Sequence, residues 1–240
     1  MVVVQPKPTS STSQRRYLRA PVPVHFRSEE EVPESRAHLR IRTALWLMLE
    51  REFKDRAIVG SEQFVYWDPT DPKQCLSPDI MVWLGPPDHS WTSWKIWERG
   101  APHLAVEVIS DSDARDRPWR RKFAAYQRTG VLELVRFEPA DARNPLRIWD
   151  RVDGDLVERE VSTLEREHSE VLDLYWCVEP SPEFGSMLRL SRDSAGLERL
   201  LTDTEVAEVE AEGRRIAEAR SEAMEVELRA LKAELALLRK

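Results

Sequence analysis

Apolar side chains recur at a helical spacing near the start of the chain and at strand-like spacings through its middle. Four runs rich in β-branched and aromatic residues predict strands over 57–68, 79–84, 103–110 and 132–139. Pro33 stands where a helix can begin without losing a hydrogen bond. From Glu34 to Phe53 the apolar spacing then predicts one long helix that faces the core through Leu39, Ala44, Leu45, Leu47, Met48, Leu49 and Phe53.

The remaining patterns predict helices and strands around these runs. Residues 113–129 read as a second helix that ends at Gly130, a residue suited to the left-handed position after a helix. A hairpin is expected across Asp153-Gly154 within residues 146–161. Two later apolar pieces, 170–180 and 186–192, extend the sheet or cover it. The fold class that follows is α/β (α+β), with a mixed sheet flanked by helices.

Three tryptophans lie between the second and third predicted strands. Trp91, Trp94 and Trp97 follow one another in steps of three, which indicates a short helix. A tryptophan stripe of this kind more often packs in a core or a lid than stacks on nucleic-acid bases.

The last segment, Asp203 to Lys240, has the pattern of one long helix without proline. Its apolar residues alternate in steps of four and three, which is the a/d seam of a coiled coil. The convincing part spans about two heptads, fewer than the three or four that a coiled coil usually shows. The helix therefore either pairs with a second copy of the chain or remains a solvated helix. The seam consists of Met224, Leu228, Leu231, Leu235 and Leu238.

Composition sets the domain organisation that we expect. The 240 residues suit one medium domain with appendages: a flexible tail rich in Ser, Thr and Pro over 1–20, a folded domain over 21–200 and a helical extension over 201–240. No apolar run is long enough for a signal peptide or a membrane span. Cys75 and Cys177 are isolated, as free thiols in a reducing cytoplasm would be.

Charge and glycine content narrow the classes of function. Eight glycines in 240 residues, with no Gly-rich phosphate-binding motif, exclude nucleotide loops. The formal charge of −7 is the wrong sign for a protein that coats nucleic acid. The second helix nevertheless carries a local excess of basic residues, which either contacts phosphates or is a solvated face.

Three charged residues stand out against the apolar pattern. Glu107 interrupts an otherwise uncharged strand, and a buried carboxylate needs a cation, a metal or a proton, unless a core arginine pairs with it. Asp79 opens a strand directly after Ser77-Pro78, where it could also be a simple turn residue. Lys122 lies on the basic helix, one turn from Tyr126, and could equally be a solvated lysine. Considered together, two carboxylates on adjacent antiparallel strands suit one Mg²⁺ ion.

A family resemblance rests on these residues. The order helix, three strands, helix and strand, with the fragments SPDIMV, AVEVIS and KFAAYQRTGVLEL, resembles the Uma-two family of restriction-endonuclease-like proteins, placed in the PD-(D/E)XK nuclease superfamily. The resemblance covers roughly residues 25–180. It implies a restriction-endonuclease-like core and a metal-dependent endonuclease.

The resemblance also implies roles for single residues. Asp79 and Glu107 would be the metal ligands, for Mg²⁺ or Mn²⁺. The lysine usually found two positions after the glutamate is Ile109 here, and Lys122 on the next helix would replace it. Ser110 corresponds to the serine of the family motif.

Two further positions bear on the site. The first helix of the family often adds an acidic or histidine group, for which Glu34 and His38 are the candidates. Pro118 occupies a place where the family commonly has aspartate, with Asp116 displaced nearby, so the start of this helix is expected to be remodelled.

The predicted function is hydrolysis of phosphodiester bonds in nucleic acid, DNA before RNA, by Asp79, Glu107 and Lys122. The alternative is a catalytically inactive nuclease fold that acts as a scaffold through its C-terminal helix. The expected partners are nucleic acid and a second copy of the chain, with no membrane and a cytoplasmic location.

Overall fold

The computed structural model describes residues 35–86, 91–109, 116–161 and 166–238, except the side chains of residues 116–118, 233, 234 and 236. The predicted tail of residues 1–20 lies outside this range, as do Glu34 and Ser110. Within the described ranges, no helix is long and apolar enough to cross a membrane.

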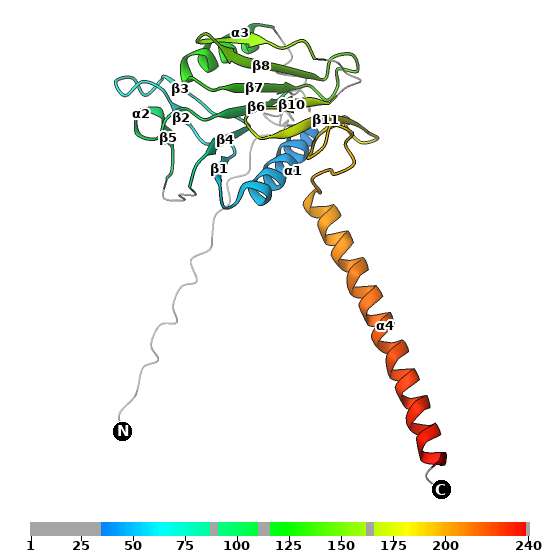
Figure 1. Ribbon diagram of the computed structural model, residues 1–240. Coiled ribbons are helices and arrows are strands. Elements are labelled where there is room, and N and C mark those ends of the chain that lie inside the picture. The colour runs from blue at the N-terminus through cyan, green and yellow to red at the C-terminus, as the bar shows by residue number, and fades with distance from the viewer. Residues whose placement is uncertain (1–34, 87–90, 110–115, 162–165, 239–240) are drawn as a thin grey trace, which may run out of the picture. The chain divides into compact units, whose positions relative to one another are not determined.

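A six-stranded mixed sheet forms the centre of the fold (Figure 1). β6 and β7 run parallel, because the helix between them returns the chain to the same end of the sheet, and every other neighbouring pair is antiparallel. In spatial order the strands are β1 (Ala57–Gly60), β4 (Ile80–Leu84), β6 (Leu104–Val108), β7 (Glu133–Phe137), β8 (Leu146–Val152) and β9 (Asp155–Glu158).

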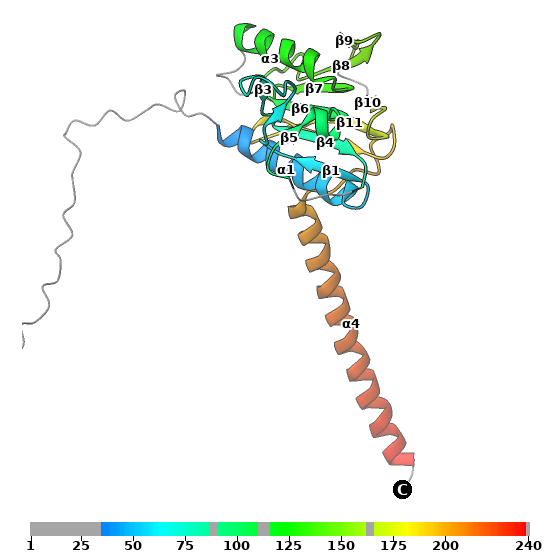
Figure 2. The same ribbon diagram turned by 90° about the vertical axis from the view of Figure 1, so that its left-hand side faces the viewer.

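Helices cover both faces of this sheet, as Figure 2 shows. α1 (Arg36–Phe53) buries Ile41, Leu45 and Leu49 against one face, in a cluster that includes Val106 and Val135. α3 (Asp116–Thr129) packs on the other face, where Tyr126 belongs to the cluster of Ala105 and Leu134. The alternation of side chains along β6 therefore sends its valines toward α1 and Glu107 toward α3.

Two smaller sheets complete the fold. β10 (Glu167–Ser169), β11 (Leu174–Ser181) and β12 (Gly185–Ser191) form one of them, and the fully buried Trp176 and Leu190 join it to the α1 side of the core. These strands cover the main sheet and do not extend it. The other consists of β2 (Val65–Tyr66), β3 (Cys75–Leu76) and β5 (Trp94–Lys95), with the one-turn helix α2 (Ile96–Arg99) after it.

Two predicted elements are wrong. The strand expected over residues 57–68 is two strands in different sheets, because the chain turns between them with Glu62 at a φ of 61°. The tryptophans over 91–97 do not lie on one helix: Trp94 is in β5, fully buried and edge-on to Trp91, while Trp97 in α2 is 45% exposed. Burial of one bulky ring set the local conformation more strongly than the three-residue spacing did.

The other elements agree with the sequence pattern. Gly130 ends α3 at a φ of 80°, and Asp153 and Gly154 turn the β8–β9 hairpin at φ values of 50° and 94°. Arg151, at the end of β8, holds the C-terminus of α3: its guanidinium donates to the carbonyl oxygens of Tyr126, Gln127, Val131 and Gly154.

The C-terminal helix α4 (Asp203–Leu238) begins against the folded core. Arg51 of α1 contacts Asp203, and Arg189 of β12 pairs with Glu205 at 2.7 Å. Beyond the first two turns almost all described side chains of α4 are exposed. The division of the chain at residue 200 into a domain and an extension stays a prediction.

Candidate active site

The register of the main sheet brings the two predicted carboxylates together. β4 and β6 are antiparallel and pair Ile80 with Val106, so Asp79 and Glu107 occupy the next opposed positions on the two strands. Both side chains are buried, with exposed fractions of 7% and 1%. Directly opposed residues of an antiparallel pair have Cβ atoms only about 4.5–5.5 Å apart. The sequence prediction that adjacent antiparallel strands hold this pair is therefore met by the geometry.

Asp79 is held through one of its two oxygens. The amide of Val108 donates to Oδ2 at 2.7 Å, and His38 Nε2 lies 3.0 Å from the same atom. Burial alone would raise the pKa of Asp79, but the hydrogen bond and charge of His38, the charge of Lys122 and the Val108 amide together hold that pKa below its usual value. Asp79 is thus an ionised carboxylate at neutral pH.

Glu107 is contacted by two side chains from one face of α3. Lys122 Nζ lies 2.5 Å from Oε2, and the buried hydroxyl of Tyr126 donates to Oε1. Burial, together with the negative charge of Asp79, raises the pKa of Glu107 to about 8 against the opposing effects of Lys122 and Tyr126. The same burial and the Glu107 charge raise the pKa of Tyr126 well above its usual value, so this hydroxyl keeps its proton.

These residues fit a divalent cation of the Mg²⁺ type. The mutual repulsion of Asp79 and Glu107, visible in the raised pKa of Glu107, is what a shared cation would relieve. Both hydrogen bonds to the Asp79 side chain end on Oδ2, so Oδ1 can accept a ligand bond. Within the described part of the chain no group of three or more His, Cys, Asp or Glu side chains is placed to hold a metal. Mg²⁺ needs only one or two carboxylates when waters and phosphate complete its shell.

Three further positions singled out in the sequence lie within the described residues. His38, one of the two first-helix candidates, contacts Asp79, and Ser35 places it by accepting its backbone N–H at 3.1 Å. Ile109 is buried, and its amide donates to the carbonyl oxygen of Phe137 in the neighbouring strand. Pro118 falls in the first turn of α3, where a missing N–H is tolerated.

A second opposed carboxylate pair, with one buried member, went unrecognised in the sequence. Glu133 on β7 is 1% exposed and lies directly opposite Asp150 on β8, on the α1 face of the sheet. Arg159 binds both oxygens of Asp150 at 2.6 and 2.8 Å and lies 3.8 Å from Glu133. Trp176 also donates to Glu133, at 2.9 Å. The one signal in the sequence was a glutamate inside the apolar run LELV. This run begins just after the predicted helix, so the glutamate was not recognised as part of a buried strand.

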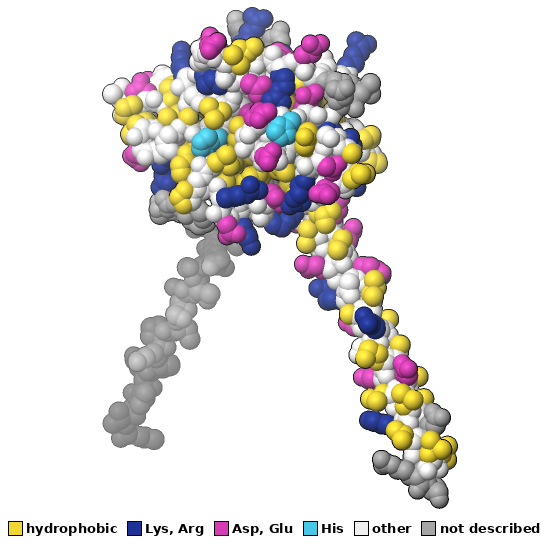
Figure 3. Space-filling model, viewed as in Figure 1, with side chains coloured by type: hydrophobic (Ala, Val, Ile, Leu, Met, Phe, Trp, Pro, Cys, Tyr) yellow, Lys and Arg dark blue, Asp and Glu magenta, His cyan; other side chains and the backbone are white. Residues whose placement is uncertain are grey.

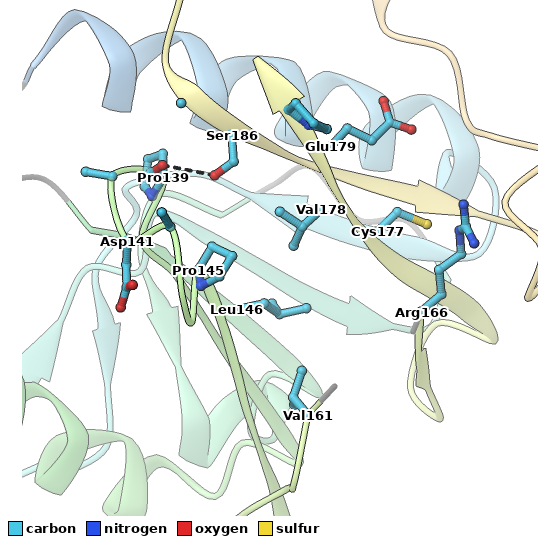
Figure 4. Close-up of a pocket in the computed structure, with 14 residues that line it drawn as sticks. Pro139, Asp141, Pro145, Leu146, Val161, Arg166, Cys177, Val178, Glu179 and Ser186 are labelled. Carbon is cyan, nitrogen blue, oxygen red and sulfur yellow. Dashed lines mark hydrogen bonds between the residues drawn. The ribbon is translucent and has the colours of Figure 1, made fainter. Parts of the chain in front are cut away.

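A cavity of about 510 Å³ lies elsewhere, between the loop after β7 and the strands β11 and β12 (Figure 4). Arg166, Cys177 and Glu179 line one side of it, and Pro139, Pro145 and Leu146 line another. Burial raises the pKa of the Cys177 thiol, so this sulfur is a poor nucleophile. None of the residues that form the Asp79 and Glu107 site takes part in this cavity.

The family comparison agrees with this geometry. A model of the family described as "Uma2: Putative restriction endonuclease" matches residues 27–181, more than half of the chain. The chain belongs to the Uma2 family. The resemblance to the Uma-two family that was inferred from the motifs is therefore confirmed, and the restriction-endonuclease-like fold class with it.

Solved structures were compared with the chain as well. The crystal structure of a putative nuclease belonging to DUF820 from Anabaena variabilis ATCC 29413 is similar to this chain at 14% sequence identity and a TM-score of 0.40. The similarity covers 62% of this chain and 74% of that one. A search among curated proteins found no match. Asp79, Glu107, Lys122 and His38 all lie within the span matched to Uma2.

Proposed function

We propose that this Uma2 protein is a metal-dependent endonuclease that hydrolyses phosphodiester bonds of DNA. The observation that carries the proposal is the opposed, buried pair of Asp79 and Glu107, with the Lys122 ammonium 2.5 Å from Glu107. A buried carboxylate pair repels itself, so a fold keeps one where a cation binds. Membership of a restriction-endonuclease family supports a nucleic-acid substrate.

Three sets of the chain's own groups prepare such a site. Asp79 and Glu107 would hold Mg²⁺ or Mn²⁺, with Asp79 already ionised. His38 and the Val108 amide fix the orientation of Asp79 through Oδ2. Tyr126 fixes Glu107 through Oε1. A bound divalent cation lowers the pKa of a water ligand and neutralises charge on the phosphate.

Lys122 supplies the remaining charge. Its side chain is 35% exposed, so the ammonium can leave Glu107 and donate to a phosphate oxygen or to the attacking water. A preorganised cation beside developing negative charge is a large contribution to phosphoryl transfer. Lys122 lies on α3, whereas the usual lysine would lie on β6. Its ammonium can supply the same chemistry from either element.

The alternative function is a catalytically inactive nuclease fold that acts as a scaffold through α4. The exposed apolar residues of α4, described below, favour a binding role for that helix. They do not compete with catalysis, because the contacts between α4 and the core, among the described residues, lie at the start of the helix. An inactive site, however, would bind no divalent metal.

The decisive experiment combines metal binding with cleavage of supercoiled plasmid. We expect the full chain to bind Mg²⁺ or Mn²⁺ in a calorimetric titration and to nick the plasmid only with that metal. Asp79→Asn should abolish the binding heat and slow nicking at least about 100-fold, the scale for a lost charge-stabilising group. Asp150→Asn is the matched control, since it alters the other carboxylate pair, and it should retain both signals.

The results also separate the two functions. Metal binding without nicking of duplex DNA would contradict the substrate, and RNA or single-stranded DNA would then be assayed. Absence of metal binding by the unaltered chain would support the scaffold. Equal nicking by the parent and Asp79→Asn would overturn the site.

A further inference from the structure

α4 carries a continuous apolar stripe that the rest of the described chain does not cover. Nine of its large apolar side chains are at least half exposed. Seven of them lie on one side of the helix. The first and the last of the seven are 29 positions apart, which is about eight full turns of 3.6 residues, so they point in nearly the same direction. In Figure 3 apolar side chains lie along the whole helix between charged ones. The stripe consists of Val209, Ile216, Met224, Leu228, Leu231, Leu235 and Leu238.

The stripe is regular enough to define a register. Met224, Leu231 and Leu238 take the d positions of a heptad, and Leu228 and Leu235 take the a positions. The other two exposed apolar residues, Val226 and Leu237, fall at positions f and c on the opposite side. Val209 and Ile216 continue the same side toward the core, with one extra residue between Ile216 and Met224.

The charges that flank this seam identify its partner. In a parallel pair, each g position lies beside the e position five residues later in the other helix. Arg220 at g would meet Glu225 of the second copy, and Glu227 at g would meet Lys232 of the second copy. Both contacts join opposite charges, and symmetry makes each contact twice. An antiparallel pair would lose both and keep only a contact between Glu225 and Lys232 at e positions.

We propose that α4 forms a parallel two-stranded coiled coil with a second copy of this chain, centred on Met224–Leu238. The seam explains why a 36-residue helix without tertiary contacts along most of its length carries so many exposed leucines. Arg51 and Arg189 anchor the N-terminal end of α4 to the core. A parallel pair of helices therefore carries its two nuclease folds at the same end of the coiled coil. This proposal does not depend on whether the site cleaves DNA.

The oligomeric state of the full chain tests the seam. In sedimentation velocity we expect a dimer that dissociates on dilution in the micromolar range, about 8 kcal/mol of binding free energy. Leu235→Lys places a charge in the seam and should give a monomer. Leu237→Lys makes the same substitution two residues away on the opposite side and should leave the dimer intact.

Three outcomes would overturn the seam. They are a monomer for the parent at all concentrations, a trimer or larger assembly, and equal loss of the dimer in both variants. Circular dichroism of the two lysine variants shows whether each retains its helix, so a folding defect is recognised.

Mild oxidation of a cysteine variant tests the direction. Met224→Cys places two thiols face to face in a parallel pair, whereas the antiparallel pairing of this seam separates them by eleven residues, about 16 Å of helix. We expect a disulfide-linked dimer for Met224→Cys and none for Val226→Cys or for the parent with its Cys75 and Cys177. A stable dimer that does not cross-link at position 224 would show the antiparallel arrangement and contradict the proposal.

A charge exchange tests the flanking contacts. Glu227→Lys should weaken the dimer several-fold, because it puts two lysines opposite each other twice. Adding Lys232→Glu should restore the affinity. No recovery in the double variant would contradict the assignment of the g and e positions.

Discussion

The main sheet holds two opposed carboxylate pairs, one on each face, and they differ in burial and in the cation beside them: Asp79 and Glu107 are both buried, whereas the Asp150 side chain is 35% exposed. Asp79 and Glu107 are opposed on β4 and β6 and face α3, while Asp150 and Glu133 are opposed on β8 and β7 and face α1. In both pairs burial raises the pKa of the glutamate. The first pair meets a lysine on a helix, and the second meets Arg159, which directly follows β9.

We expect this difference to separate a structural carboxylate pair from the pair that we propose to bind metal. Arg159 binds Asp150 through two hydrogen bonds and also reaches the His168 carbonyl oxygen at 2.6 Å, so its guanidinium is a fixed part of the fold. Lys122 Nζ lies 2.5 Å from Glu107 Oε2, and the Lys122 side chain is 35% exposed. A buried glutamate is therefore no sign of catalysis by itself.

The largest expected effect is on cleavage, in paired glutamine variants. Glu107→Gln removes a proposed metal ligand and should lower the nicking rate at least about 100-fold. Glu133→Gln keeps an acceptor for Trp176 and should cut within about twofold of the parent. Initial rates on supercoiled plasmid at saturating Mg²⁺ measure both. If Glu133→Gln were the inactive variant, the catalytic site would have to be assigned to the Glu133 and Asp150 pair and not to the Asp79 and Glu107 pair.

A smaller effect is expected on stability when each counter-charge is removed. Arg159→Met leaves Asp150 and Glu133 opposed without a cation and should lower the free energy of unfolding by about 3 kcal/mol. Lys122→Met should lower it by about 1 kcal/mol or less, since that lysine is partly exposed and Glu107 can take a proton. Urea unfolding near neutral pH compares the two. Equal losses would show that Lys122 is as fixed as Arg159.

The smallest effect is the pH dependence of stability without metal. The pKa of Glu133 is raised above 4.5 in the folded chain, so its contribution to stability is present below that pH and is lost as pH rises through the folded pKa. Glutamine cannot ionise, so the stability of Glu133→Gln relative to the parent should increase with pH.

The same measurement on Glu107→Gln sharpens the comparison. It should show the same sign, with the increase continuing to about pH 8, where Glu107 ionises. Urea unfolding in EDTA at several pH values from about 5 to about 9 gives both curves. A relative stability of either variant that falls with rising pH would contradict the raised pKa.

The sequence predicted the first pair well, because its signals are local. Asp79 and Glu107 are charges at the edge of or inside short apolar runs, and the order of strands made them neighbours. Lys122 was predicted from its helix and its family motif. The metal role of the two carboxylates stays a prediction.

The second pair could not be predicted, because it depends on contacts between distant segments. Arg159 and Trp176 reach Glu133 from two other strands, and neither shows a local pattern that points there. The two-residue strands β2, β3 and β5 have the same origin: their pairing is fixed by burial of Trp94 and not by their own propensity. His38 was predictable in part. The sequence placed it on the first helix, but its contact with Asp79 could not be predicted.

The contacts of Arg151 limit where a reporter can be inserted into this protein. The tip of the β8–β9 hairpin is exposed and has a glycine, so it resembles a convenient point for splicing in a fluorescent reporter. Arg151 binds the Gly154 carbonyl oxygen at that tip and the end of α3 with the same guanidinium. A reporter inserted there would loosen the helix that carries Lys122 and Tyr126. We therefore expect an insertion at the hairpin tip to disturb the proposed site.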